Sequence, residues 1–330
     1  RSFTTPGLFD MLRTHSTSEI TAAHDGKTVT IGGLIRSKRE HGNIIFLVVA
    51  DRDGEVQVTA KKGDVPDSVM KTVASLGKES VVTVAGTVKK NSQAPRGVEL
   101  IPRSINILSV SEPVLPLDFK VKASIDKRLD WRSIDLRKKE VMAIFKVQSA
   151  LIHGMINYLQ KERYLQVFTP CLIGSTSEGG ADVFPVIYFQ KEAFLRQDPQ
   201  LHRELAIVGG LDKIYDIGPS WRAEPSHTTR HLCEHRGCAV EASFISDEQE
   251  VMRIEENLVV AALESAKKLC AADFELLNIK LSIPKTPFPV LEFPGVYDIL
   301  ENMGKTIPHG EDYDRESEVL LWEYVKKKFK

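Results

Sequence analysis

The sequence predicts an α+β protein in two parts: a small β-barrel, followed by an antiparallel sheet flanked by helices. Five short runs in the first third alternate apolar and polar residues, as half-buried strands do, with one helical stretch after the third run. Two more alternating runs enclose a long polar segment within Tyr215–Phe244. Stretches with helical periodicity lie on both sides of this hairpin.

The order of the five runs predicts an OB-fold, a small barrel that binds single-stranded nucleic acid on an exposed sheet face. Helical spacing in Pro66–Leu76 falls between the third and fourth runs, as that fold requires. Asp51–Gly54 predicts a hairpin turn with a positive φ at Gly54. The runs are Thr28–Gly33, Asn43–Ala50, Glu55–Ala60, Ser80–Lys89 and Glu99–Val110.

The exposed face of such a barrel needs an aromatic side chain to stack a base and polar side chains to read its edge. Phe46 is the aromatic candidate, although its residue type alone favours a place in the barrel core. Arg39, Gln57 and Glu112 are the polar candidates.

The polar segment of the hairpin carries residue types that hold a nucleotide. Arg222 and Glu224 are two residues apart, and therefore on one face of a continuing strand. A guanidinium binds phosphate or carboxylate through two hydrogen bonds, and a carboxylate accepts from an adenine amine. Arg230 and His231 follow in the same segment. On spacing alone, a solvated hairpin with weak surface ion pairs remains the alternative.

Two long amphipathic helices are predicted, and a proline-containing segment without clear periodicity separates the barrel from the first of them. The helices are Lys139–Glu162 and Ser246–Lys268, and a basic helical run occupies Glu316–Lys330. The expected organisation is a tail or cloning remnant at 1–10, a barrel domain at 11–112, a hinge at 113–135 and a second domain at 136–330.

The composition is that of an ordinary globular protein, with 330 residues, 42% apolar and 27% charged. The net charge of −1 means that a nucleic acid would have to be bound by local basic patches. Four scattered cysteines lack zinc-site spacing and predict free thiols in a reducing, cytoplasmic location. No apolar run is long enough to span a membrane, so no membrane partner is expected.

The residues 221–224, 229–234 and Glu241 with Phe244 resemble motif 2 of the class II aminoacyl-tRNA synthetases. The chain as a whole is similar to the aspartyl-tRNA synthetases of class IIb, archaeal/eukaryotic type, over about residues 12–330. The other segments that match that family are Arg128–Arg137, Tyr164–Pro170, Ser175–Gly180, Phe194–Arg203, Lys285–Pro289 and Ile307–Asp312.

The resemblance implies an ATP-dependent attachment of aspartate to tRNA(Asp) through aspartyl-adenylate, with Mg²⁺ as the metal. Arg222 would be the catalytic residue, because its counterpart binds the α-phosphate and the substrate carboxylate. Glu224, Arg230, His231 and His235 would complete the ATP site.

The resemblance also implies an amino-acid site in which Glu178, on a mobile loop, closes over aspartate. Gln200 and Arg203 would hold the substrate from below, and Pro170 would lie at a homodimer interface.

In the barrel domain, Arg39, Phe46, Gln57 and Glu112 would contact the anticodon of the tRNA. Phe46 would stack a base, and Gln57 would read the central anticodon base.

Four positions depart from the family pattern. Asp198 replaces a serine, Arg203 replaces a lysine, Ala239 replaces the aspartate that binds the substrate ammonium group, and His235 replaces an adenine-stacking aromatic residue. The family's motif 3, with its Mg²⁺ ligands, would follow Lys330. Two alternatives therefore stay open: a catalytically incomplete paralogue or fragment that binds tRNA or a partner, and an asparaginyl-type relative. Whether tRNA(Asn) is a substrate is also open.

Overall fold

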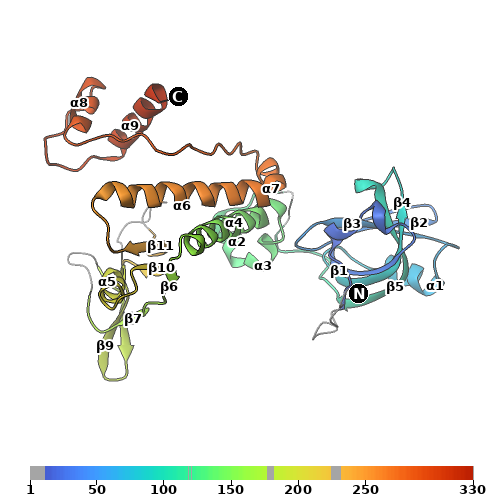
Figure 1. Ribbon diagram of the computed structural model, residues 1–330. Coiled ribbons are helices and arrows are strands. Elements are labelled where there is room, and N and C mark those ends of the chain that lie inside the picture. Colours follow the sequence, from blue (N-terminus) through green and yellow to red (C-terminus); the bar gives the residue numbers. More distant parts are fainter. Residues whose placement is uncertain (1–11, 118, 120, 177–181, 224–231, 330) are drawn as a thin grey trace, which may run out of the picture. The chain divides into compact units, whose positions relative to one another are not determined.

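The computed structural model describes residues 12–117, 119, 121–176, 182–223 and 232–329. The chain divides after Lys138 into two compact units, which Figure 1 shows as a barrel of blue to green strands and a mixed unit of helices and sheets.

The first unit is the predicted barrel. Within the described residues, its strands close in the order β1-β2-β3-β5-β4, with α1 between β3 and β4. The first strand runs on to His41, beyond the predicted end at Gly33. The elements are β1 (Thr28–His41), β2 (Ile44–Ala50), β3 (Glu55–Lys61), α1 (Asp67–Ser75), β4 (Val81–Lys90) and β5 (Val98–Ser109).

Alternation fills the barrel interior. On β2, Ile45, Leu47 and Val49 enter the core, as every second residue of a strand does. Closure also needs close backbone contacts at two glycines: a Cβ added at Gly33 would collide with the carbonyl of Ala50, and one added at Gly86 would collide with that of Ile101. These positions accept no side chain because a neighbouring strand lies directly over them.

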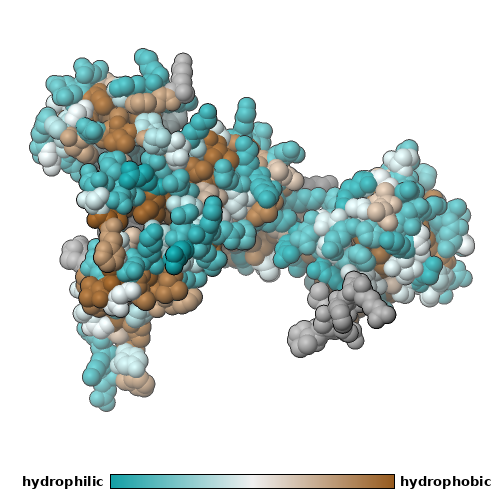
Figure 2. Space-filling view, in the orientation of Figure 1, coloured by the Kyte–Doolittle hydropathy of each residue, from teal (hydrophilic) through white to brown (hydrophobic). Residues whose placement is uncertain are grey.

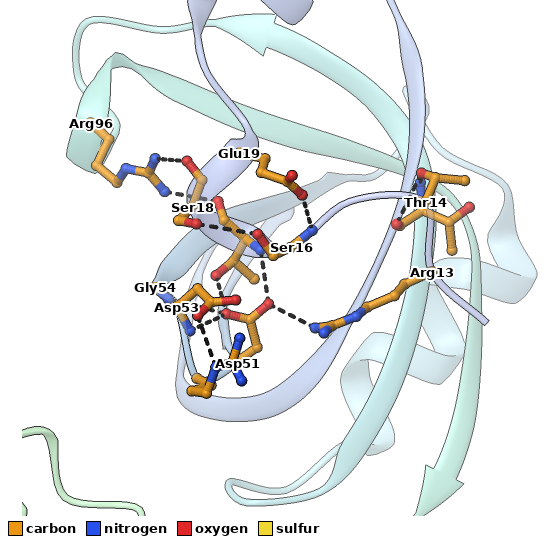
Figure 3. A network of polar contacts seen from close by, with 12 residues as sticks. Arg13, Thr14, Ser16, Ser18, Glu19, Asp51, Asp53, Gly54 and Arg96 are labelled. Atoms are coloured by element: carbon orange, nitrogen blue, oxygen red, sulfur yellow. Dashed lines mark hydrogen bonds and ion pairs between the residues drawn. The ribbon is translucent and has the colours of Figure 1, made fainter. Parts of the chain in front are cut away.

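The turn between β2 and β3 differs from the prediction, because Gly54 does not have a positive φ. Instead, the Asp51 carboxylate accepts hydrogen bonds from the backbone N–H groups of Asp53 (2.9 Å) and Gly54 (3.1 Å). It also accepts from Thr17 and from the Arg13 guanidinium (Figure 3). Because the aspartate side chain closes the turn by these hydrogen bonds, the turn does not require a positive φ at Gly54.

The segment before β1 is fixed to the barrel by Arg96, whose guanidinium donates to the carbonyl groups of Thr17, Ser18 and Ile20. Short 3₁₀ turns lie on both sides of this contact: η1 (Thr17–Glu19), η2 (Ala22–His24) and η3 (Pro95–Gly97).

The segment predicted as an unstructured hinge contains two short helices, α2 (Ile125–Asp130) and α3 (Arg132–Asp135). The Asp135 carboxylate is fully buried and pairs with Arg128 and Arg132, each at 2.9 Å. Hydrogen bonding from Arg128 lowers the pKa of Asp135, although burial opposes this shift. Charge pairing, rather than apolar periodicity, therefore orders this segment.

A second buried carboxylate anchors the end of the same segment to the barrel. Glu79 pairs with Arg36 of β1 at 2.7 Å and with Arg137 at 3.0 Å, and Arg36 also donates to the carbonyl oxygen of Arg137.

The second unit is built on helices α4 and α6, which confirm the two predicted amphipathic helices; the Asp247 side chain caps α6. Its sheets have the orders β11-β10-β6 and β7-β9-β8 in the described residues. The elements are α4 (Lys139–Lys161), β6 (Leu165–Gln166), β7 (Leu172–Ile173), β8 (Pro185–Tyr188), β9 (Lys191–Leu195), α5 (Gln200–Val208), β10 (Lys213–Trp221), β11 (Glu234–Ala242), α6 (Glu248–Leu269), α7 (Ala271–Leu276), α8 (Gly295–Asn302) and α9 (Arg315–Lys328).

Apolar side chains also reach the surface of this unit. Leu201, Leu205 and Val208 form an exposed stripe along α5, where Figure 2 shows hydrophobic side chains gathered. Across the described residues, no helix is both long enough and apolar enough to cross a membrane.

Candidate active site and nucleic-acid interface

The β10–β11 hairpin confirms the two strands predicted within Tyr215–Phe244. They pair antiparallel from Lys213 opposite Ala242 to Trp221 opposite Glu234. One face carries Tyr215, Ile217, Cys238 and Val240, which pack in the core with residues of α4 and α6. The alternation therefore puts polar and small residues on the opposite face: Asp216, Gly218 and Ser220 from β10, and His235, Gly237, Ala239 and Glu241 from β11.

Arg222 extends this polar face by one residue. Its backbone N–H donates to the Cys233 carbonyl at 3.0 Å, which continues the ladder past Trp221, and its side chain is exposed. The next residue, Ala223, donates to the carbonyl of Asp182, which follows the predicted mobile loop Ser175–Gly180 by two residues. Four predicted site residues lie outside the described residues: Glu178, Glu224, Arg230 and His231.

The middle of the polar face is organised by Arg196, which sequence reasoning did not single out. Its guanidinium donates to the Pro219 carbonyl at 2.6 Å, to Thr169 and to the Asp216 carboxylate at 3.4 Å. Arg196 and Asp216 are both buried. A Cβ added at Gly218 would collide with the guanidinium, so glycine makes room for it. A buried charge pair on an otherwise open face was not visible in the sequence, because its partners come from separate strands.

Ala239 stands where the family has an aspartate, and it lies directly opposite Asp216 in the β10–β11 register. The carboxylate at this part of the face belongs to Asp216, and it already accepts from Arg196 and from the Thr169 hydroxyl.

Arg203 is buried and held by two carboxylates. Its Nη1 and Nη2 atoms donate to the two oxygens of Asp198, at 3.1 and 2.7 Å, and its Nε donates to Glu241 at 3.1 Å. Burial opposes its charge, but the bonds from Asp198 and Glu241 outweigh this effect and raise the pKa of Arg203. The residue predicted to hold aspartate is therefore already engaged by Asp198, the residue that replaces the family's serine.

The remaining predicted residues of this unit are exposed. Gln200, at the start of α5, donates to Glu204 at 2.8 Å, and no hydrogen bond among the described residues joins it to Arg203. His235 is opposite Ser220, near the Arg222 end of the face. Pro170 is exposed between β6 and β7, rather than at the end of a strand.

On the barrel, the register puts two of the four candidates for an exposed face, Arg39 and Phe46, directly opposite each other. Arg39 on β1 is opposite Phe46 on β2, which in turn is opposite Thr59 on β3. Phe46 is half-buried and alternates with the core residues Ile45 and Leu47, so it lies on the outer face. The interpretation of Phe46 as a core aromatic is therefore wrong.

Gln57 is on the same outer face, two residues from Thr59, and its side chain is almost fully buried among polar partners. Its amide Nε2 donates to Thr59 Oγ1 at 3.2 Å and to Glu99 Oε2 at 3.4 Å. The Thr59 hydroxyl donates to the same Glu99 oxygen at 2.5 Å. Sequence reasoning missed Glu99, because only the parallel pairing of β3 with β5 puts it opposite Gln57.

Glu112 lies elsewhere on the first unit. It lines cavities of about 550 and 690 Å³ together with Glu79. Within the described residues, no hydrogen bond connects it to Gln57 or Glu99. A search of the same residues for three or more clustered His, Cys, Asp or Glu side chains that could hold a metal finds none.

Two family comparisons agree with this architecture. Residues 124–330 match the tRNA synthetases class II (D, K and N), and residues 29–108 match the OB-fold nucleic acid binding domain. The chain belongs to this family of class II tRNA synthetases.

Among individual relatives, the chain is 42% identical over 320 residues to the aspartate–tRNA(Asp/Asn) ligase of Methanothermobacter thermautotrophicus, covering 96% of this chain and 73% of the relative. It is 40% identical over 317 residues to the aspartate–tRNA(Asp) ligase of Pyrococcus abyssi, with 96% and 72% covered.

Solved structures of class II tRNA synthetases also resemble this chain. The asparaginyl-tRNA synthetase of Pyrococcus horikoshii, complexed with asparaginyl-adenylate, superposes with a TM-score of 0.87 at 31% identity, covering 96% of this chain and 73% of that one. The aspartyl-tRNA synthetase of Entamoeba histolytica superposes with a TM-score of 0.80 at 26% identity, covering 96% and 69%.

Proposed function

We propose that this protein attaches aspartate to tRNA(Asp) through an aspartyl-adenylate, using ATP and Mg²⁺. The observation that carries the proposal is the polar face of β10 and β11, which ends at Arg222, next to the backbone hydrogen bond between Ala223 and Asp182. Membership in the class II family and the names of the relatives support the reaction class.

In the first step, an oxygen of the aspartate α-carboxylate attacks the α-phosphorus of ATP, and pyrophosphate leaves. In the second, a ribose hydroxyl at the tRNA end attacks the aspartyl carbonyl, and AMP leaves. Both steps depend mainly on positioning and on stabilising negative charge. Arg222 would neutralise charge at the α-phosphate, and His235 would face the adenine.

Glu224, Arg230 and His231 would complete the nucleotide site, and Glu178 would cover the amino acid beside Gln200 and Arg203. The described residues contain no cluster of three or more His, Cys, Asp or Glu side chains that could hold Mg²⁺.

The test is ATP–pyrophosphate exchange driven by aspartate, with Arg222→Ala as the variant. Loss of a charge-stabilising donor should lower kcat by about 100-fold or more. Arg253→Ala, which removes an exposed arginine from α6, is the matched control and should leave exchange unchanged. Undiminished exchange by Arg222→Ala would contradict the proposed role. Absence of aspartate exchange in the parent protein, with RNA binding retained, would identify a binding paralogue instead, and exchange with asparagine would identify an asparaginyl-type enzyme.

We also infer that the barrel binds the anticodon through Arg39, Phe46, Gln57 and Glu112. The outward position of Phe46, next to a cation on one side and hydrogen-bonding groups on the other, supports a base-stacking site. A homodimer in the cytoplasm, with Pro170 at the interface, completes the proposal. The exposed ring of Phe168, two residues before Pro170, supports that surface.

A further inference from the structure

The ion pair between Arg196 and Asp216, on the polar face of β10, leaves one nitrogen and one oxygen unused. Nε of Arg196 donates to the Pro219 carbonyl, and Nη1 donates to the carbonyl and hydroxyl of Thr169 and to Asp216. No described residue accepts from the two N–H groups of Nη2. Both bonds to the Asp216 carboxylate, from the Thr169 hydroxyl and from Nη1, end on its Oδ2 atom. Among the same residues, Oδ1 has no donor.

The two unused atoms are accessible and lie together above Gly218. The side chains that carry them are only 3% and 5% exposed. Within the described ranges, only a nitrogen of His202 is both fully buried and without a hydrogen-bond partner, so Nη2 and Oδ1 reach solvent. A Cβ built at Gly218 would collide with Nη2 and would lie 3.2 Å from Oδ1. A cationic donor and an anionic acceptor are therefore offered side by side.

The neighbouring strand leaves space beside these atoms. Gly237 of β11 is directly opposite Gly218, on the same face, and a Cβ built there would meet no described atom within 4 Å. Ala239, which is directly opposite Asp216, contributes only a methyl group. A small ligand over β11 therefore has room next to both unused atoms.

An ion pair that served stability alone would use both nitrogens and both oxygens, as Arg203 and Asp198 do. Arg196 cannot adopt that geometry, because two backbone carbonyl groups hold its Nε and Nη1 atoms. Leaving charged atoms unpaired in a nearly buried place costs free energy, and a ligand that pairs with both atoms removes this cost. The complementary ligand carries an ammonium group for the carboxylate and a carboxylate for the guanidinium, as an amino acid does.

We propose that Arg196 and Asp216 bind the amino acid substrate. Asp216 Oδ1 accepts from the α-ammonium group of aspartate, and Arg196 Nη2 donates to its side-chain carboxylate, so the α-carboxylate stays free to attack ATP. Asparagine offers the guanidinium only a neutral amide, and the pair therefore favours aspartate. This inference rests on the proposed synthetase function, and it assigns amino-acid binding to residues beyond Arg203, whose guanidinium is already engaged by Asp198.

The experiment compares the binding of aspartate and of succinate to the whole protein by isothermal titration calorimetry. Succinate is aspartate without the ammonium group, so the ratio of the two dissociation constants measures the contribution of that group. The parent protein should bind aspartate about tenfold or more tightly than succinate, as expected for a hydrogen bond between charged groups.

Asp216→Asn should abolish this preference. Arg196 and the Thr169 hydroxyl still require an acceptor at the Oδ2 position, so the amide oxygen stays there and the NH₂ group replaces Oδ1. Because an NH₂ group cannot accept from ammonium, aspartate binding should weaken about tenfold or more, whereas succinate binding should not weaken. Adding Ala239→Asp, which puts a carboxylate directly opposite on the same face, should restore the preference for aspartate.

Asp212→Asn is the matched control, because it removes the same charge from an exposed position just before β10 and should keep the parent ratio. Arg196→Lys, which removes Nη2, should weaken both ligands about equally and serves if Asp216→Asn does not fold. An Asp216→Asn protein that keeps the parent ratio, or that loses both ligands equally, overturns the inference, and so does an Arg196→Lys protein that binds both as the parent does. A parent protein that binds neither ligand refutes the proposed aspartate chemistry itself.

Discussion

At the residue scale, the charge balance around Arg203 decides how an anionic amino acid could be held. The cluster contains one buried cation, Arg203, and two partly exposed carboxylates, Asp198 and Glu241. The planar guanidinium already makes a two-bond contact with Asp198, which is the contact that a substrate carboxylate would need. A bound aspartate must therefore compete with Asp198 for Arg203, or be held by other groups.

Asp198→Ser should strengthen aspartate binding. The change frees both Nη atoms of Arg203 and removes a negative charge beside the substrate. Because a hydrogen bond to a charged group contributes about 1.5–3 kcal/mol, KM for aspartate in ATP–pyrophosphate exchange should fall about tenfold, with kcat little changed.

The control for this change is Asp64→Ser, which removes an exposed carboxylate from the barrel unit and should leave KM unchanged. An unchanged or higher KM for Asp198→Ser would show that the Asp198–Arg203 pair supports the substrate site rather than competing with it.

At the scale of elements, α4 and α6 are in backbone contact at Gly154. A Cβ built there would lie 2.5 Å from the Ala261 carbonyl oxygen and 2.6 Å from the Ser265 Cβ. The Ser265 hydroxyl also donates to the Ala150 carbonyl at 2.8 Å, which fixes the two helices at this separation. The β10–β11 hairpin packs on these two helices. The distance between the helices therefore determines the surface on which the hairpin, and its polar face, rests.

Gly154→Ala should destabilise the second unit. Alanine is the better helix former by about 1 kcal/mol, but overpacking two helix backbones costs about 1–3 kcal/mol. The contact distances of 2.5 and 2.6 Å favour the upper part of that cost, so we expect the free energy of unfolding to fall by up to about 2 kcal/mol in denaturant titration. His153→Ala, at the adjacent exposed position of α4, should show no comparable loss, and a stabilised Gly154→Ala protein would exclude the tight crossing.

The segment before α4 should contribute acid-dependent stability through Asp135. Its pKa is lowered in the folded state, so its contribution is complete above the unfolded value of about 3.9 and is lost as pH falls through the folded value. Asp135→Asn should cost roughly 3 kcal/mol at pH 7, because it breaks a buried pair with Arg128.

The difference in unfolding free energy between Asp135→Asn and the parent protein should shrink in titrations at pH 3 and below. Asp126→Asn, in the first turn of α2, is the matched control and should follow the parent protein at both pH values. A difference that stays constant with pH would mean that Asp135 acts through packing alone.

At the scale of the whole molecule, the family assignment rests on both units, since one matches the catalytic family and the other the OB-fold family. Assembly is the open question at this scale. Phe168 is 84% exposed beside Pro170, where a dimer surface is proposed. Aromatic side chains are enriched at the core of protein interfaces.

Phe168→Asp should convert a dimer to a monomer in sedimentation analysis at micromolar concentration, because it would bury a charge in the interface. Val110→Asp, at another exposed apolar position in the barrel unit, should leave the dimer intact. A parent protein that sediments as a monomer would refute the proposed assembly.

The sequence by itself determined the class and the longest elements. Strand alternation located the barrel strands and the β10–β11 hairpin, and helical periodicity located α4 and α6, because these signals arise within short stretches of chain. The end of β1, the turn at Asp51 and the helices α2 and α3 were not predicted correctly. β1 continues because its second half pairs with β2. The Asp51 carboxylate closes its own turn, and ion pairs with Asp135 join α2 and α3. Alternation and helical periodicity do not show any of these contacts.

Only the tertiary structure decided which charges meet. The pairing of Arg203 with Asp198 and Glu241, of Arg196 with Asp216, and of Gln57 with Glu99 depends on strand register and on which strands are neighbours. Register and strand order are set by closure of the barrel and by packing of the sheet on α4 and α6. These are properties of the folded chain, and no single stretch of sequence contains them.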